Sequence, residues 1–274
     1  MKKMKKLMVL FTCATLSATP VTAETIPTTA ESTATTETPA PTVTPKPAKV
    51  KRGWVILKNG KKRYYRNGKR LLGFQKIGKN YFYFNKNGIM QINKTIPNGT
   101  KGYTYYTNRK GHVYAKTKGS KYFNANGSRM SDKQLAEFLS KQIAAKITTP
   151  GMSKEQKLQT CFNWVIKKYY YIWRRFDQGG KNWPAVFAND HFLYGKGDCI
   201  SDAGAFAYLA KAIGYKNVYV CADARQSNNN AHSWAEINGL VYDPLFAEAK
   251  SYSKYYGCTY GSYGLYAVTR YKLS

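Results

Sequence analysis

An aromatic pair followed by a turn glycine recurs four times between residues 51 and 130, and this repeat limits what that segment can form. The four units are Tyr64-Tyr65 with Gly68, Tyr83-Phe84 with Gly88, Tyr105-Tyr106 with Gly111, and Tyr122-Phe123 with Gly127. Asn-Gly between alternating aromatic runs is a strong signal for a two-residue hairpin turn. A repeat period of about 20 residues predicts stacked, solenoid-like β-hairpins, because one such hairpin is too small to fold alone.

Charge is concentrated in the same segment. The chain of 274 residues has 44 Lys and Arg against 14 Asp and Glu, a net charge of +30. Residues 51–130 carry 20 of the basic residues and no acidic one. Such an excess indicates an anionic partner and argues against an ordinary neutral cytosolic enzyme. No run of apolar residues is long enough to predict a membrane-spanning helix.

The first 50 residues resemble an export signal followed by a spacer. Four lysines precede a short apolar run at Leu7–Leu16, and Val21-Thr22-Ala23 has the small residues of a cleavage site. We therefore expect residues 1–23 to be a signal peptide and the protein to be secreted. Residues 24–50 contain nine Thr, five Pro and no aromatic residue, which predicts a Thr/Pro-rich linker that does not fold. Whether this linker also serves as a spacer is left open.

The repeats resemble a known family of binding modules. Gly53-Trp54 with Lys62–Gly68, and Gly73–Gly78 with Tyr81–Gly88, are similar to the cell-wall-binding (choline-binding-type) repeats of Gram-positive surface proteins. In that family, aromatic cages between hairpins hold a choline ammonium by cation–π attraction. The resemblance implies wall-binding aromatic residues at Trp54, Tyr64, Tyr65, Phe74, Tyr83 and Phe84.

The ligand expected for these repeats is anionic. Among the aromatic residues of the repeats, residues 51–130, only Trp54 is a tryptophan, and the cationic surroundings would repel choline. An anionic wall polymer, teichoic acid or peptidoglycan, fits the charge better, and we expect the protein to associate with the cell wall. The alternative is that the tyrosines pack the hairpins and the lysines form a solvated face. Nucleic acid is not expected as a partner, because the protein is predicted to be exported.

Residues 131–274 show helices first and strands afterwards. Ser131 with Gln134, and Ser153 with Gln156, form capping boxes that begin two amphipathic helices. A third helix is expected from Cys199 to just before Gly214. Strands are expected at residues 217–222, 231–237, 240–242 and 265–271. This order predicts an α+β domain with an antiparallel sheet.

Cys199 is the candidate nucleophile. It follows the turn Gly197-Asp198 at the expected start of a helix, where the dipole and free N–H groups would lower a thiol pKa. The same N–H groups would stabilise an oxyanion. The chain has three histidines, and His112 lies in the repeats, so His191 and His232 remain as candidate bases.

A hairpin turn places His232 near an acidic residue. If Asn238-Gly239 is a two-residue turn, Trp234 faces Asp243 across two strands, and His232 lies diagonally from Asp243. Diagonal neighbours are about 7–8 Å apart at the backbone, within reach of long side chains. An imidazole oriented by Asp243 and facing Cys199 is a nucleophile–base–orienter arrangement.

Three motifs in this order resemble the transglutaminase-like superfamily. They are Gly197–Ala203 ending in Ala212–Tyr215, then Ala231–Ile237, then Val241–Pro244. The resemblance covers about residues 131–270 and implies a papain-like fold, with Cys199 as nucleophile, His232 as general base and Asp243 as orienter. It also implies an upstream oxyanion donor, for which Trp183 and Gln178 are the candidates.

The implied activity is that of a cysteine protease or acyltransferase acting on amide bonds of proteins or peptides. The thiolate would form a thioester, which an amine or water would resolve, so transfer and hydrolysis both remain open. The alternative is a wall adhesin with a papain-like domain that only binds.

Other polar residues of this domain are expected to be structural. We expect His191 to lie in a loop or serve structure, Trp234 to pack beside the site, and Glu236 and Asp202 to be solvated or helix-start charges. Cys161 is expected in the core. A Cys221–Cys258 disulfide stays open, because spacing does not fix connectivity. No metal site and no cofactor are expected, because no His, Cys and carboxylate cluster has ligand spacing.

Overall fold

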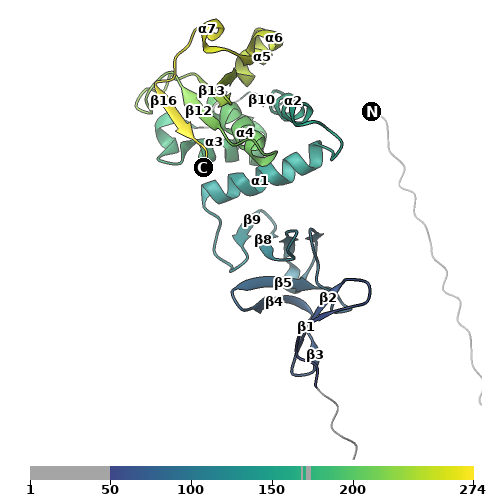
Figure 1. The fold of residues 1–274 in the computed structure, drawn as a ribbon. Helices are drawn as coiled ribbons and strands as arrows, with labels where there is room; N and C mark the ends of the chain where they lie inside the picture. Colours follow the sequence, from purple (N-terminus) through teal and green to yellow (C-terminus); the bar gives the residue numbers. More distant parts are fainter. Residues whose placement is uncertain (1–49, 168, 171–173) are drawn as a thin grey trace, which may run out of the picture. The chain divides into compact units, whose positions relative to one another are not determined.

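A computed structural model describes residues 50–274 except 168 and 171–173 (Figure 1). The expected signal peptide, and the linker up to residue 49, lie outside the described residues. None of the described helices is long and apolar enough to cross a membrane. Within the same residues, no group of three or more His, Cys, Asp or Glu side chains is placed to hold a metal ion.

Residues 53–124 form three small antiparallel sheets. Their orders are β1-β2-β3, β4-β5 and β6-β7-β8-β9. The strands are β1 Gly53–Ile56, β2 Lys62–Arg66, β3 Lys69–Arg70, β4 Gly73–Ile77, β5 Asn80–Phe84, β6 Thr95–Ile96, β7 Thr104–Thr107, β8 Val113–Lys118 and β9 Lys121–Asn124, with the 3-10 turn η1 at Thr100–Gly102. The antiparallel hairpins confirm the β-rich prediction, whereas a continuous solenoid is not seen.

Two kinds of turn follow the aromatic pairs. Asn67-Gly68 joins β2 to β3 as a two-residue turn with positive φ at both residues (50° and 78°), as the sequence predicts. The other three units use longer turns, in which the glycine N–H donates to the carbonyl of an asparagine three residues earlier, as Gly88 does to Asn85. The Asn85 side chain also accepts from two N–H groups of its turn. A shared Asn-Gly dipeptide therefore does not give a shared turn.

Aromatic side chains pack the hairpins against one another. The Trp54 ring lies 5.1 Å from the Tyr64 ring and 5.1 Å from the Phe82 ring, both edge to face. Phe82, Phe84 and Met90 form a small buried core. These contacts support the packing interpretation for part of the aromatic set.

The remaining residues form the predicted α+β domain. Its helices are α1 Asp132–Ile147, α2 Lys154–Val165, α3 Trp183–Tyr194, α4 Cys199–Ala212, α5 Pro244–Ala249, α6 Tyr252–Tyr255 and α7 Tyr260–Tyr263, with the 3-10 turn η2 at Phe176–Gly179. Its strands are β10 Tyr169–Tyr170, β11 Lys196–Gly197, β12 Val218–Ala222, β13 Ser233–Ile237, β14 Leu240–Tyr242, β15 Tyr256–Cys258 and β16 Thr269–Lys272. Both capping boxes are formed, at Ser131 and Ser153.

An antiparallel sheet in the order β15-β14-β13-β12-β16 carries the predicted strands. β10 and β11 form a separate parallel pair. The turn at Asn238-Gly239 pairs Ile237 with Leu240, which is the register expected from the sequence.

Helix α4 is the centre of this domain. Residues 199–210 are all buried, because α4 packs against α1, α3 and β13. Gly204 allows the close approach of α3, since a Cβ atom there would lie 2.8 Å from the Pro184 carbonyl oxygen. Most of α4 is apolar, as expected for a helix that is covered on all sides, with Ser201 and Asp202 as buried polar exceptions. The first residue of this rigid element is Cys199.

Candidate active site

The position of Cys199 is set by the turn before α4. Asp198 is the N-cap, and its Oδ1 accepts the N–H groups of Ile200 and Ser201 at 3.0 and 3.1 Å. Gly197 is required by space, because a Cβ atom there would lie 2.1 Å from Cβ of Ser201. The cap leaves fewer free N–H groups for an oxyanion than the sequence suggested.

The Cys199 thiol has a raised pKa, contrary to the expectation from helix position. Burial is the main cause, and the charge of Asp198 adds to it, while a backbone hydrogen bond from Ser233 acts in the opposite direction. Helix polarity is offset here because the acidic cap lies directly beside the thiol. The thiol is therefore protonated at neutral pH, and its activation requires a nearby base.

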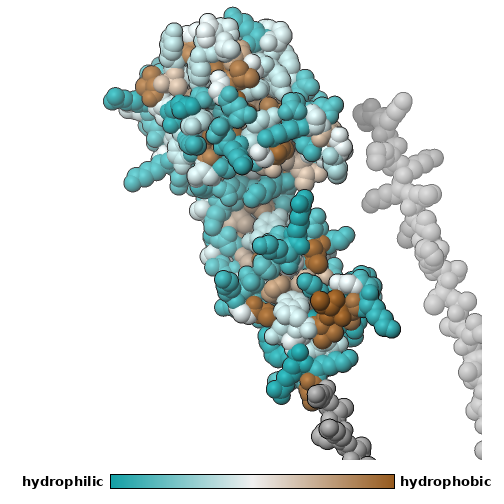
Figure 2. Space-filling model, in the orientation of Figure 1, coloured by the Kyte–Doolittle hydropathy of each residue, from teal (hydrophilic) through white to brown (hydrophobic). Residues whose placement is uncertain are grey.

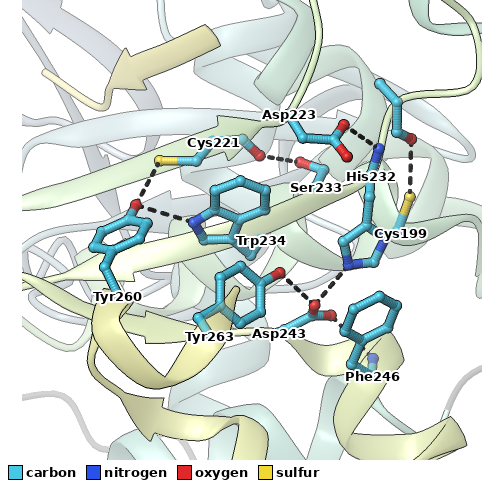
Figure 3. A network of polar contacts seen from close by, with 11 residues as sticks. Cys199, Cys221, Asp223, His232, Ser233, Trp234, Asp243, Phe246, Tyr260 and Tyr263 are labelled. Atoms are coloured by element: carbon cyan, nitrogen blue, oxygen red, sulfur yellow. Dashed lines mark hydrogen bonds and ion pairs between the residues drawn. The ribbon is translucent and has the colours of Figure 1, made fainter. Parts of the chain in front are cut away.

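The Cys199 thiol contacts the two residues that flank His232, the predicted base. The Cys199 Sγ–H donates to the carbonyl oxygen of Ala231 at 3.6 Å, and Ser233 donates its backbone N–H to the sulfur. His232 lies between these two residues. Figure 3 shows the thiol and the imidazole in one network. The structure thus brings together the predicted nucleophile and base.

The His232 ring is fixed from three sides. Its Nε2 lies 2.6 Å from Oδ2 of Asp243, its backbone N–H donates to Asp223, and the Phe246 ring stacks on it at 4.0 Å. Because Nε2 contacts Asp243, any proton exchange between this ring and the thiol would use Nδ1.

Asp243 contacts the His232 ring and also caps a helix. Its side chain is fully buried, and Oδ1 accepts the N–H of Phe246 at 3.0 Å as the N-cap of α5. Oδ2 accepts the Tyr263 hydroxyl at 2.6 Å in addition to His232. The Asp243 side chain therefore contacts three groups: the Phe246 N–H, the Tyr263 hydroxyl and the His232 ring.

Tyr263 is a site residue that sequence reasoning missed. Burial and the neighbouring Asp243 raise the pKa of its hydroxyl, so it donates to the carboxylate and does not ionise. It comes from α7, twenty residues after Asp243 and within a tyrosine-rich segment. No motif separates it from its neighbours in that segment.

Trp234 packs beside the site as expected, but Glu236 is not solvated. Trp234 is fully buried, and its indole N–H donates to the Tyr260 hydroxyl, which donates to Glu236. Arg270 holds Glu236 with two bonds of 2.9 and 2.6 Å. Burial raises the pKa of Glu236, but the hydrogen bonds from Arg270 and Tyr260 outweigh it, and the net shift is downward. The expectation of a solvated charge was wrong because its partner lies on β16, far along the chain.

His191 and Asp202 form a second buried pair. Nδ1 of His191, on α3, lies 2.9 Å from Oδ1 of Asp202, one turn after Cys199 on α4. Asp202 lies in the first turn of α4, which agrees with the expected helix-start charge, but it is buried and not solvated. Burial raises its pKa, and His191 partly offsets this. His191 thus lies in a helix and not in a loop, and its contact with Asp202 agrees with the expected structural role.

The other cysteines and the two oxyanion candidates lie outside this network. The described cysteines are all free, including Cys221 and Cys258. Cys161 is in the core as expected, and burial raises its pKa to about 12. Trp183 packs against Phe176, and Gln178 accepts the N–H of Arg175. No contact of either candidate with Cys199 is seen in the described part of the chain, and the oxyanion donor stays a prediction.

The predicted wall-binding aromatics differ in exposure. Trp54 is 43% exposed, whereas Phe84 is 1% exposed and belongs to the hairpin core. Phe84 therefore cannot contact a polymer directly. Tyr64, Tyr65, Phe74 and Tyr83 are partly buried between strands.

Solved structures similar to part of this chain include two choline-binding proteins and a sucrase. The choline-binding domain of Spr1274 from Streptococcus pneumoniae is 28% identical, covering 23% of this chain and 92% of that one, with a TM-score of 0.20. Choline-binding protein F from Streptococcus pneumoniae is 28% identical, covering 30% of this chain and 27% of that one, with a TM-score of 0.23. Alternansucrase is 24% identical, and the match covers 29% of this chain and 6% of that one, with a TM-score of 0.24. This chain thus spans only a small part of the last two proteins.

Among curated proteins, no match was found. Residues 141–247 match the family model described as the transglutaminase-like superfamily. That range includes the nucleophile helix α4, the hairpin β13-β14 and the cap of α5. The chain therefore contains a transglutaminase-like domain, and Cys199, His232 and Asp243 all lie within it.

Proposed function

We propose that the protein is an exported, wall-associated cysteine enzyme that transfers or hydrolyses acyl groups at amide bonds of proteins or peptides. One observation carries the catalytic part. The Cys199 thiol contacts the residues on both sides of His232, and Nε2 of His232 is bound to the buried carboxylate of Asp243. This is the relation that a nucleophile, its base and an orienting group need.

The first half-reaction forms a thioester. His232 Nδ1 takes the proton of the Cys199 thiol, and the thiolate attacks the carbonyl carbon of the substrate amide. The imidazolium, stabilised by Asp243, then gives its proton to the departing nitrogen, and the C–N bond breaks. An amine leaves, and the acyl group remains on sulfur.

The second half-reaction releases the acyl group. An incoming amine or water attacks the thioester while His232 takes its proton, and the proton returns to the sulfur as the C–S bond breaks. An amine gives a new amide, and water gives a carboxylic acid. The raised thiol pKa makes the transfer from sulfur to His232 essential in this scheme, because little free thiolate exists beforehand.

Product analysis tests this proposal. The protein lacking residues 1–23 is incubated with a glutamine-bearing peptide and a lysine-bearing peptide, and the products are identified by mass spectrometry. A crosslink with loss of ammonia, or a hydrolysed product, supports the enzyme. No product from these or a wider set of amide peptides, together with no reaction of Cys199 with a thiol-directed affinity probe, would favour the domain that only binds.

The wall-binding part rests on charge. Residues 51–130 carry 20 basic and no acidic residues, and their hairpins expose cations on a scaffold of packed aromatics. The matching experiment is a pull-down on purified walls, with and without teichoic acids, across a salt series and a choline series. Release by salt supports an anionic polymer, and release by choline at low salt contradicts it.

A further inference from the structure

One aromatic cage of the hairpin region is filled by the chain itself. The Lys116 ammonium lies 5.1 Å from the centroid of the Phe74 ring and 5.1 Å from that of the Tyr103 ring. Phe74 also stacks on Tyr105 at 4.8 Å, which closes the cluster further. Burial and the charge of Lys101 lower the pKa of Lys116. A cage that already holds an ammonium by cation–π attraction has no room for a second one.

A second aromatic pocket is open. It is a cavity of about 290 Å³ that we call the Trp54 pocket, lined chiefly by Trp54, Phe82, Met90, Lys62, Lys110 and His112. Three hairpins build it, because Met90 donates its N–H to the Lys62 carbonyl at 2.9 Å and Phe82 bridges to His112. Figure 2 shows hydrophobic side chains among hydrophilic ones over the N-terminal hairpins.

The lining of this pocket combines two chemistries. Phe82 and Met90 give a buried apolar floor, and Trp54, 43% exposed, offers an aromatic face to a ligand ring. Lys62 and Lys110 add two ammonium groups, and the ring of His112 meets the Phe82 ring edge to face at 5.2 Å. No acidic residue exists in residues 51–130 to offset these charges. Lysine recognises phosphate as a point charge, whereas a bound ammonium would face two like charges.

We propose that the Trp54 pocket binds a sugar ring that carries a phosphate, as one unit of an anionic wall polymer. The sugar lies on Trp54 above the apolar floor, and the phosphate lies between Lys62 and Lys110. The proposal deepens the proposed wall-binding function and rests on it. It assigns specific recognition to one pocket, while the remaining cations of residues 51–130 supply nonspecific attraction.

Calorimetric titration of the protein lacking residues 1–23 tests the pocket. The probes are N-acetylglucosamine 1-phosphate, uncharged N-acetylglucosamine and choline at low salt. We expect binding of the phosphate sugar, binding at least tenfold weaker for the uncharged sugar, and no binding of choline. The double variant Lys62→Gln/Lys110→Gln is expected to bind the phosphate sugar at least tenfold more weakly.

Two further variants separate the pocket from general charge and from folding. Lys58→Gln/Lys79→Gln removes the same charge from two exposed lysines that do not line the pocket, and is expected to change affinity less than twofold. Trp54→Ala removes the ring platform and is expected to abolish sugar-phosphate binding. The lysine variants leave the core of Phe82, Phe84 and Met90 intact, so they test the pocket even where Trp54→Ala unfolds the hairpin.

The outcomes distinguish the pocket from the wall-binding function. If both lysine double variants weaken sugar-phosphate binding equally and wall binding is retained, the pocket proposal is overturned and the electrostatic wall-binding function stands. Choline binding that is lost in Trp54→Ala also overturns it, in favour of an ammonium cage. Failure of the unmodified protein to bind walls at all is a failure of the proposed function itself.

Discussion

Asp243→Asn separates the catalytic role of this residue from its structural one. The asparagine carbonyl keeps the cap on the Phe246 N–H, but its amide group now faces His232 and Tyr263, where the carboxylate oxygen accepted two bonds of 2.6 Å. Two donors cannot share a bond, so the His232 ring is driven to carry its proton on Nδ1. That proton occupies the nitrogen that must accept the thiol proton.

The expected loss of rate is large. A base fixed in the wrong tautomer lowers turnover by about 10⁴-fold, which corresponds to about 5.4 kcal/mol at about 1.36 kcal/mol per factor of ten. The loss of stability is smaller. Each weakened bond to a charged group is worth about 1.5–3 kcal/mol, and the neutral amide recovers part of this because burying it costs less than burying a carboxylate. We expect a net destabilisation below about 3 kcal/mol.

The assay pairs turnover with thermal unfolding of the same preparations. Tyr263→Phe is the matched control, since it removes one bond to Asp243 without changing the tautomer of His232. It should lower the rate by about tenfold and stability by a similar free energy to Asp243→Asn. An Asp243→Asn protein with an unchanged rate and a large drop in melting temperature would refute the reasoning and leave Asp243 as a helix cap alone.

Three further perturbations test the surroundings of the site. Asp198→Asn keeps the cap but removes a charge that raises the Cys199 pKa, so alkylation by iodoacetamide at pH 7–8 should be faster; an equal or slower rate contradicts the electrostatic account. Glu236 has a lowered pKa when folded, so its stabilisation is present above its unfolded pKa of about 4.3 and is lost as pH falls through the folded value. Glu236→Gln should therefore destabilise the protein by about 1.5–3 kcal/mol at pH 7 and by less near pH 3, and equal loss in urea titrations at both pH values counts against this. Gly204→Ala should cost about 1–3 kcal/mol, because its Cβ would lie 2.8 Å from a backbone oxygen of α3; unchanged thermal stability would show that the helices separate freely.

Much of the fold was predictable from sequence motifs that act over a few residues. The capping boxes at Ser131 and Ser153 each begin a helix, because the cap and its partner lie within one turn of the chain. The Asn238-Gly239 turn fixes the register of β13 and β14, and this register brings His232, just before β13, close to Asp243, just after β14. The contact of His232 with Asp243 was therefore predictable, because it depends mainly on neighbours in sequence.

Features set by distant or fully buried partners were not predictable. Helix α3 is buried on most sides, so its residues show no helical periodicity. Glu236 is paired with Arg270, which lies 34 residues later. Because the sequence shows no partner near Glu236, a solvated charge was the natural expectation. The raised pKa of Cys199 also depends on distant packing. The thiol is buried because α4 is packed on all sides, and this burial overrides the effect of helix position. Tyr263 reaches Asp243 only through the fold of the last helices.

The central claim is that Cys199 performs acyl chemistry with His232 and Asp243. The most direct measurement compares Cys199→Ala with Cys161→Ala and Cys258→Ala in the peptide product assay, with each protein shown to be folded by circular dichroism. Cys161 is a core thiol and Cys258 a partly exposed one, so they control for packing and for surface thiol reactivity. The account predicts no product from Cys199→Ala and retained product from both controls. Product formation by folded Cys199→Ala at the rate of the unmodified protein would contradict it.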